Sequence, residues 1–203
     1  MPEKILSTRG LNTLMFSDPY AKLCFTAHLV SQFDKVIYID LDTTFTAYFN
    51  STLVKPREGS IIDVYLPSEG RLVPMMRDVI ESMSRSQLVI FDSVNSFYNL
   101  FPAQVRTGEL NHLLSVLLML LVRRGFDENI PVLATSMLRY RKDWGWVQSP
   151  ASRRLLKHRS AVRLSVERSS SGNDDIVVTI EEHDSLPTGT QLIYGKDNRL
   201  ITF

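Results

Sequence analysis

Basic and aromatic side chains are concentrated between residues 139 and 163. This stretch contains eight basic residues and one acidic residue, Asp143, whereas the rest of the chain contains 15 basic and 21 acidic residues. Basic groups bind phosphates by releasing counterions, and exposed aromatic rings offer stacking surfaces to unpaired bases. The stretch is therefore predicted to bind single-stranded DNA or RNA. The expected contacts are Arg139, Arg141, Lys142, Trp144, Trp146, Arg153, Arg154, Lys157 and Arg159.

Two other interpretations of the same stretch stay open. It could be a solvated basic face, or its tryptophans and arginines could anchor an interface between subunits, where both residue types are enriched. The chain as a whole has 23 Lys and Arg residues against 22 Asp and Glu residues, a net charge of +1. No global field therefore attracts a nucleic acid or an acidic membrane.

The remaining composition excludes several classes of protein. Hydrophobic residues make up 44% and charged residues 22% of the chain, as in ordinary globular proteins. The single cysteine, Cys24, excludes an intramolecular disulfide and a multi-cysteine metal site, and the four histidines lack the spacing of a metal site. The longest nearly apolar run, residues 113–122, is too short to span a bilayer. We expect a cytoplasmic protein that contacts no membrane and holds no metal.

The order of apolar segments predicts the scaffold that positions these residues. Strands are expected at 11–16, 35–41, 60–66, 87–92 and 131–135, and helices at 20–33, 73–83 and 107–124. The strands are apolar throughout, as in a parallel sheet that is buried on both faces. For the last helix we expect Thr107 as the N-terminal cap and Gly125 just past the C-terminal end. The pattern predicts a doubly wound α/β fold with a mostly parallel sheet.

The last forty residues have a different pattern. Short runs at 161–167, 176–182, 190–194 and 199–203 are separated by turn-forming segments, which is typical of antiparallel hairpins. We expect a β-meander that extends one edge of the sheet. The whole chain, 1–203, is then one domain with an α/β core over 1–160 and β-hairpins over 161–203.

Three segments of this scaffold resemble the RecA/RadA/KaiC-type ATPases. The segment VIYIDLDTTF (36–45) resembles the strand that follows the phosphate-binding helix, and LVIFDSVNSF (88–97) is similar to the Walker B strand. PVLATSM (131–137) falls where that family has its sensor strand. The resemblance spans nearly the whole chain and implies a RecA-like fold, in which the stretch after the sensor strand carries a nucleic-acid-binding loop. It also implies contacts between neighbouring subunits.

The sequence departs from that family at the phosphate-binding loop. The motif G-x-x-x-x-G-K-[ST] is absent. In that motif the glycines let backbone N–H groups wrap the phosphates, and the Ser or Thr binds magnesium. If Lys22 stands for the motif lysine, Phe16 and Ala21 replace the glycines and Leu23 replaces the magnesium ligand. Lys22 itself is expected to be a solvated lysine on the surface of a helix.

The residues just before Lys22 add to this departure. Asp18 and Pro19 form a favourable start for a helix, with Asp18 as its N-terminal cap. The Asp18 carboxylate would then lie where the resemblance places a phosphate, and it would repel one.

Two further positions of the nucleotide site are also altered. Asp42 replaces the catalytic glutamate of the family, and Ser136-Met137 replaces its polar sensor pair. Asp92 is retained at the Walker B position, where it could cap a nearby turn or keep a residual metal role. Together Lys22, Asp42 and Asp92 are the candidates for a vestigial nucleotide site.

These departures predict a pseudo-ATPase without a cofactor. The resemblance then implies an accessory subunit of the RadA-paralogue or KaiC-like kind, which serves DNA recombination or repair and associates with itself or with a RecA-like partner. One alternative is a subunit like the accessory subunits of Elongator, which lack the loop and bind tRNA. Another is a divergent ATPase that still binds nucleotide weakly through Lys22, Asp42 and Asp92.

Overall fold

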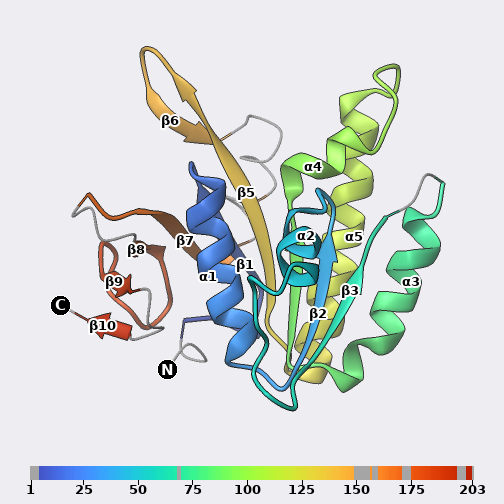
Figure 1. Ribbon diagram of the computed structural model, residues 1–203. Coiled ribbons are helices and arrows are strands. Elements are labelled where there is room, and N and C mark those ends of the chain that lie inside the picture. Colours follow the sequence, from blue (N-terminus) through green and yellow to red (C-terminus); the bar gives the residue numbers. More distant parts are fainter. Residues whose placement is uncertain are drawn as a thin grey trace.

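Figure 1 shows the computed structural model, in which helices lie on both faces of one long sheet. The structure describes residues 5–67, 70–148, 156, 160–170, 175–195 and 200–202. The strands are β1 (Leu11–Phe16), β2 (Lys35–Asp40), β3 (Ile61–Tyr65), β4 (Leu88–Asp92), β5 (Val132–Arg141), β6 (Gly145–Gln148), β7 (Ser160–Arg168), β8 (Ile176–Glu182), β9 (Gln191–Tyr194) and β10 (Leu200–Thr202). The helices are α1 (Pro19–Ser31), α2 (Thr44–Asn50), α3 (Leu72–Ser82), α4 (Val94–Asn99) and α5 (Thr107–Glu128), with a 3-10 turn at Met83–Arg85.

The sheet has two halves that differ in strand direction. Its order is β10-β9-β8-β7-β1-β5-β4-β2-β3, and β6 pairs only with β5. The pairs from β7 through β1, β5, β4 and β2 to β3 are all parallel, whereas β7, β8, β9 and β10 pair antiparallel in succession. This confirms the predicted α/β fold and the predicted meander at one edge.

The central strands are buried on both faces because alternate residues contact different helices. Leu14, Tyr38 and Ile90 belong to the apolar cluster that includes α1 and α2. Ile37 and Phe91 belong to the cluster on the opposite face, with α3, α4 and α5. Strands β2 and β4 run in the same direction and both end beside the start of α1. The side chains at the two strand ends meet there.

Helix α5 differs at both ends from the prediction. Arg106, not Thr107, is its N-cap residue, and no side chain caps the helix there. The helix passes through Gly125 and ends at Glu128, where Asn129 adopts a left-handed conformation (φ 59°). A Cβ at Gly125 would lie 2.6 Å from the Ile130 carbonyl oxygen. This glycine therefore allows α5 to approach the start of β5, rather than ending the helix.

Two other features were not predicted. The short helices α2 and α4 follow β2 and β4, and no helix was predicted in either segment. Strand β5 continues to Arg141 instead of ending at Thr135, and it forms a hairpin with β6 that projects beyond the sheet (Figure 1). Among the described residues, no helix is long and apolar enough to cross a membrane.

Candidate functional site

The connection between β1 and α1 is only two residues long, Ser17 and Asp18. Asp18 caps the helix, because its Oδ1 accepts a hydrogen bond from the Tyr20 backbone N–H at 2.9 Å, and Pro19 is the first helical residue. The other carboxylate oxygen of Asp18 forms an ion pair with Arg168 of β7. The predicted cap is confirmed, and the chain's own carboxylate occupies the start of this helix.

The residues at the positions of the missing motif fill the apolar core. Phe16 is 3% exposed, Ala21 is fully buried, and Leu23 is 6% exposed. Helix α1 begins at Pro19, so the segment between Phe16 and Ala21 is mostly strand and helix rather than loop. At the start of α1, Pro19 has no backbone N–H and the Tyr20 N–H is bonded to Asp18 Oδ1, so neither residue offers a free N–H group to a phosphate.

Lys22 is buried, and the prediction of a solvated lysine was wrong. Its side chain is 2% exposed, and its Nζ lies 2.7 Å from Asp92 Oδ2 and 3.7 Å from Asp42 Oδ2. The ammonium group also lies 5.4 Å from the centre of the Phe16 ring. The first turn of α1 packs directly on the ends of β2 and β4, so this position faces the carboxylates rather than the solvent.

Asp92 is the centre of a buried hydrogen-bond network. Its Oδ2 accepts hydrogen bonds from Lys22 Nζ at 2.7 Å and from the Tyr38 hydroxyl at 2.6 Å, and its Oδ1 accepts one from the Thr135 hydroxyl. The Tyr38 ring stacks on Phe45 at 3.8 Å between centroids. Burial, and then the charge of Asp92, raises the pKa of Tyr38 well above its ordinary value, so the tyrosine remains a donor.

The role of Asp92 differs from the turn cap considered for it. Helix α4, which follows Asp92, is capped by Ser93, whose hydroxyl accepts a hydrogen bond from the Ser96 N–H at 3.2 Å. The Asp92 carboxylate instead joins β4 to α1, β2 and β5 through Lys22, Tyr38 and Thr135.

Asp40, at the end of β2, is a member of the site that the sequence analysis missed. Its Oδ2 accepts hydrogen bonds from the backbone N–H and hydroxyl of Thr46 at 2.7 and 2.6 Å. Burial raises its pKa, the Thr46 hydrogen bonds lower it, and the charges of Asp92 and Asp42 raise it again, so that the pKa lies above the ordinary value. The sequence does contain a signal for it. Asp40 lies two residues before the predicted Asp42, and side chains two residues apart on an extended strand point to the same face.

Asp42 is the most exposed of the three aspartates in this site. Its side chain is 28% exposed. Burial raises its pKa, but the Lys22 charge and hydrogen bonds from Thr44 and Asp40 outweigh burial, so that the pKa lies below the ordinary value. The pKa shifts of these two neighbouring carboxyl groups therefore have opposite directions, upward for Asp40 and downward for Asp42.

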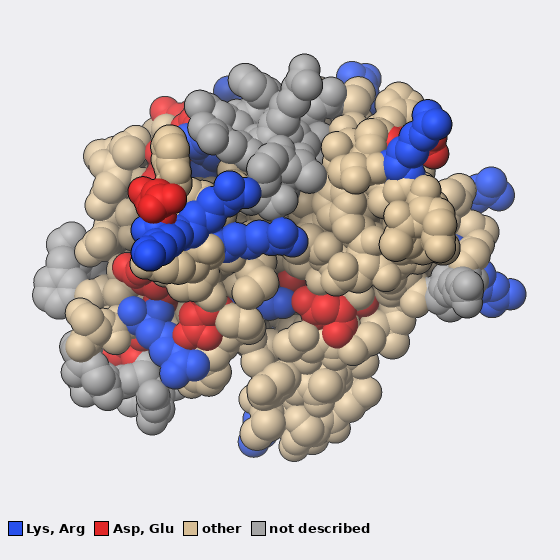
Figure 2. All heavy atoms as spheres, turned by 90° about the horizontal axis from the view of Figure 1, so that it is seen from above, with Lys and Arg blue, Asp and Glu red and all other residues tan. Residues whose placement is uncertain are grey.

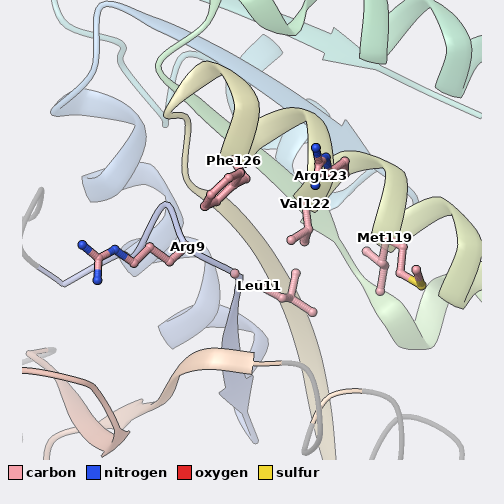
Figure 3. Close-up of a pocket in the computed structure, with 8 residues that line it drawn as sticks. Arg9, Leu11, Met119, Val122, Arg123 and Phe126 are labelled. Atoms are coloured by element: carbon pink, nitrogen blue, oxygen red, sulfur yellow. The ribbon is translucent and has the colours of Figure 1, made fainter.

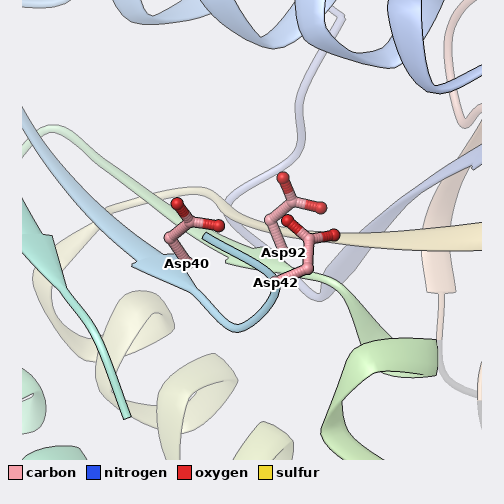
Figure 4. A group of neighbouring side chains, drawn as sticks. All are labelled: Asp40, Asp42 and Asp92. Atoms are coloured by element: carbon pink, nitrogen blue, oxygen red, sulfur yellow. The ribbon is translucent and has the colours of Figure 1, made fainter. Parts of the chain in front are cut away.

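The three aspartates lie close enough together to raise the question of a metal ion (Figure 4). Each has one carboxylate oxygen within 4.8 Å of the others. A divalent cation needs ionised oxygens with free lone pairs. Here Lys22 already neutralises Asp92 and approaches Asp42, and Asp40 is hydrogen-bonded to Thr46. The Lys22 ammonium group is therefore the cation that this cluster holds, and Asp40 Oδ1 is a buried carboxylate oxygen of the cluster without a hydrogen-bond partner among the described residues.

The hairpin of β5 and β6 separates basic from aromatic residues. The antiparallel register pairs Tyr140 with Trp146 and Arg139 with Val147. Since paired residues share a face and neighbours alternate, Tyr140 and Trp146 lie on one face of the hairpin, and Arg139 and Arg141 lie on the other. The rings of Tyr140 and Trp146 meet edge to face at 5.6 Å.

Only part of the predicted nucleic-acid-binding stretch lies within the described residues. Tyr140, Trp144 and Trp146 are 65%, 78% and 53% exposed, and Lys142 lies in the hairpin turn. Arg153, Arg154, Lys157 and Arg159 lie outside the described residues. Figure 2 views the molecule from the hairpin end, and among the described residues visible there, Lys and Arg side chains lie next to Asp and Glu side chains.

A second surface feature lies at the start of β1, beside the second half of α5 (Figure 3). It is a pocket of about 430 Å³ whose apolar lining includes Leu11, Met119, Val122 and Phe126. Met119 and Phe126 are 50% and 56% exposed. Exposed apolar surface of this kind is typical of a contact with another protein.

Comparison with known proteins supports the fold. No model of a protein family and no curated protein sequence matches the chain. Among solved structures, the RadB recombinase is similar over 98% of this chain and 92% of its own, with 19% sequence identity and a TM-score of 0.62. The chain therefore has the RecA-like fold that the sequence motifs implied.

Proposed function

We propose that this protein is a non-catalytic RecA-like subunit that binds nucleic acid and assembles with copies of itself or with another RecA-like subunit. The observation that carries the proposal is the buried ion pair between Lys22 and Asp92. In a phosphate-binding loop, the lysine must reach the phosphates and the glycine backbone must wrap them. Here the lysine is committed to a carboxylate, and Asp18 adds a negative charge at the start of the helix.

The absence of nucleotide binding is tested on the purified chain. A ligand that binds the native state must raise its melting temperature by mass action. We expect no shift with ATP and magnesium at millimolar concentrations and no ATP hydrolysis above background. Steady hydrolysis that disappears in Lys22→Ala would contradict the proposal and favour the divergent ATPase.

The proposed nucleic-acid contacts are on the basic face of the hairpin. Arg139 and Arg141 lie on this face and Lys142 lies in the adjoining turn. The similarity to the RadB recombinase favours a role in DNA recombination or repair. Stacking of bases on Trp144 and Trp146 remains a prediction, because the register places Trp146 on the opposite face of the hairpin from Arg139 and Arg141.

Nucleic-acid binding is tested by titrating fluorescent single-stranded DNA, single-stranded RNA, duplex DNA and tRNA with the protein at several salt concentrations. We expect binding that weakens steeply with salt, since phosphate contacts dominate the affinity. Preference for tRNA over every DNA would favour the Elongator-like alternative. No detectable binding of any of the four at low salt would show that the stretch is only a solvated face.

The proposed assembly is tested by measuring the mass of the protein in solution. The exposed apolar residues of α5, Met119 and Phe126, are the proposed contact. We expect association that does not depend on nucleotide and that decreases in Phe126→Ser. The matched control is Val73→Ser, which changes an exposed apolar residue on α3 (54% exposed).

A further inference from the structure

A pocket lies between the β5–β6 hairpin and strands β7 and β8. It has a volume of about 520 Å³, and its lining includes Met15, Leu138, Trp144, Trp146, Glu167 and Glu181. One wall is therefore aromatic and apolar, and the opposite wall carries two carboxylates. Neither the three clustered aspartates nor Arg139 and Arg141 line the pocket.

The aromatic wall follows from the register of the hairpin. Leu138, Tyr140, Trp146 and Gln148 share the face that turns away from Arg139 and Arg141, because Leu138 pairs with Gln148 and Tyr140 pairs with Trp146. The edge-to-face contact with Tyr140 fixes the orientation of the Trp146 ring. The hairpin thus presents a held indole to the pocket.

The acidic wall comes from two adjacent strands. Glu167 lies on β7 and Glu181 lies on β8, and the Ser165 hydroxyl donates a hydrogen bond to Glu181 Oε1 at 2.6 Å. Within the described part of the chain, neither glutamate forms an ion pair. The nearest arginines on the same strand are committed elsewhere, Arg163 to Glu182 and Arg168 to Asp18.

This combination of groups selects a cation and disfavours a phosphate. Indole rings attract cations through the negative faces of their π systems, and carboxylates bind guanidinium groups through paired, charge-assisted hydrogen bonds. A guanidinium group is planar, so it can lie flat on a ring and form paired hydrogen bonds to a carboxylate at the same time, whereas an ammonium group offers no flat face. Met15 and Leu138 provide apolar surface for an aliphatic stem.

We propose that this pocket binds an arginine side chain that a partner protein presents. The pocket is larger than a guanidinium group alone, and its apolar residues suit the methylene groups of an arginine within a peptide. The tryptophans then serve recognition of a protein, whereas the basic face of the same hairpin serves nucleic acid.

Intrinsic fluorescence gives a direct test, because the chain has only two tryptophans and both line the pocket. The probe is the capped tripeptide Gly-Arg-Gly, and its matched control replaces arginine with citrulline, which has the same shape without the charge. We expect a saturable change in emission with the arginine peptide and at least about tenfold weaker binding of the citrulline peptide. Binding of both peptides with equal affinity would overturn the proposal.

Variants locate the binding site. Glu167→Gln and Glu181→Gln should each weaken binding of the arginine peptide several-fold, and Glu182→Gln is the control, because Glu182 pairs with Arg163 and does not line the pocket. In Trp144→Phe, Trp146 is the only tryptophan left, so its emission alone reports on binding of the peptide. Thermal melting of each variant checks that it folds, and folded Glu167→Gln and Glu181→Gln variants that bind like the unchanged protein would overturn the proposal.

Two competing occupants are tested with the same signal. If single-stranded DNA changes the tryptophan emission and displaces the arginine peptide, the tryptophans stack on bases and the proposal is overturned. The segment between Gln148 and Ser160 contains four basic residues, Arg153, Arg154, Lys157 and Arg159. If replacing all four with Gln opens the pocket to a peptide that the unchanged protein does not bind, the chain fills its own pocket and the proposal is likewise overturned.

Discussion

Replacement of Lys22 with Met would remove the cation of the buried ion pair and keep most of the aliphatic volume of the side chain. The two charged atoms are 2.7 Å apart, and the side chains of Lys22 and Asp92 are 2% and 0% exposed. With an effective dielectric constant of about 20, the attraction of two unit charges at this distance is about 6 kcal/mol. Withdrawing each ion from water costs several kcal/mol, so the intact pair is nearly balanced.

The substituted protein loses the attraction but keeps the cost of burying Asp92. We therefore expect Lys22→Met to lower the free energy of unfolding by about 3–5 kcal/mol. Urea denaturation at neutral pH measures this loss. Lys35→Met is the matched control, because Lys35 pairs with Asp63 at 3.8 Å with both side chains partly exposed, and it should change the stability by less than about 1 kcal/mol.

A second substitution separates the ion pair from simple packing. Adding Asp92→Asn to Lys22→Met removes the unpaired buried charge, so the double variant should be more stable than Lys22→Met alone. A stability of Lys22→Met within about 1 kcal/mol of the unchanged protein would refute the buried pair. A double variant that is less stable than the single one would show that packing, not charge, explains the loss.

Three further predictions concern individual side chains. The pKa of Asp40 is raised in the folded state, so its contribution to stability is complete below the unfolded pKa and is lost as the pH rises through the folded pKa; Asp40→Asn should therefore stabilise the protein at neutral pH and flatten the pH dependence of its denaturation midpoint. Asp18→Ala should lower the free energy of unfolding by about 0.5–2 kcal/mol, and an unchanged midpoint would contradict the cap. Arg141→Ala should weaken binding to all single strands alike and lower the salt slope by about one unit, whereas Arg57→Ala, which changes an arginine paired with Asp34, should leave the slope unchanged.

The buried strands β2 and β4 could be predicted because each is a continuous apolar run, and the C-terminal strands could be predicted because turn-forming segments separate them. The end of α5 could not be predicted in this way. Gly125 has the local signature of a helix end, but its missing side chain serves a contact with Ile130 and Val132. Such a contact is tertiary, and a reading of neighbouring residues cannot distinguish it from a cap.

Lys22, Asp42 and Asp92 were predicted as members of the candidate site, whereas Asp40 and the arrangement of the four side chains were not. The motifs placed Lys22, Asp42 and Asp92 together, and the structure joins them in one buried network. The direction of the Lys22 side chain depends on how α1 packs against the sheet, which is not a local property. Arg139 and Trp146 lie on opposite faces of the hairpin, and this follows only from the register of β5 and β6. The strand predicted at 131–135 stops before both residues, so no register was predicted for them.

The short β1–α1 connection also limits how this site could be redesigned. Introducing a phosphate-binding loop would require glycines at Phe16 and Ala21 and a hydroxyl at Leu23, and all three side chains are buried. Truncation of a buried phenylalanine alone costs about 3–5 kcal/mol, which is a large part of the stability of an ordinary domain. Each of these substitutions would destabilise the protein before the set was complete. The β1–α1 connection therefore resists conversion into a phosphate-binding loop far more strongly than the exposed surfaces of the protein resist substitution.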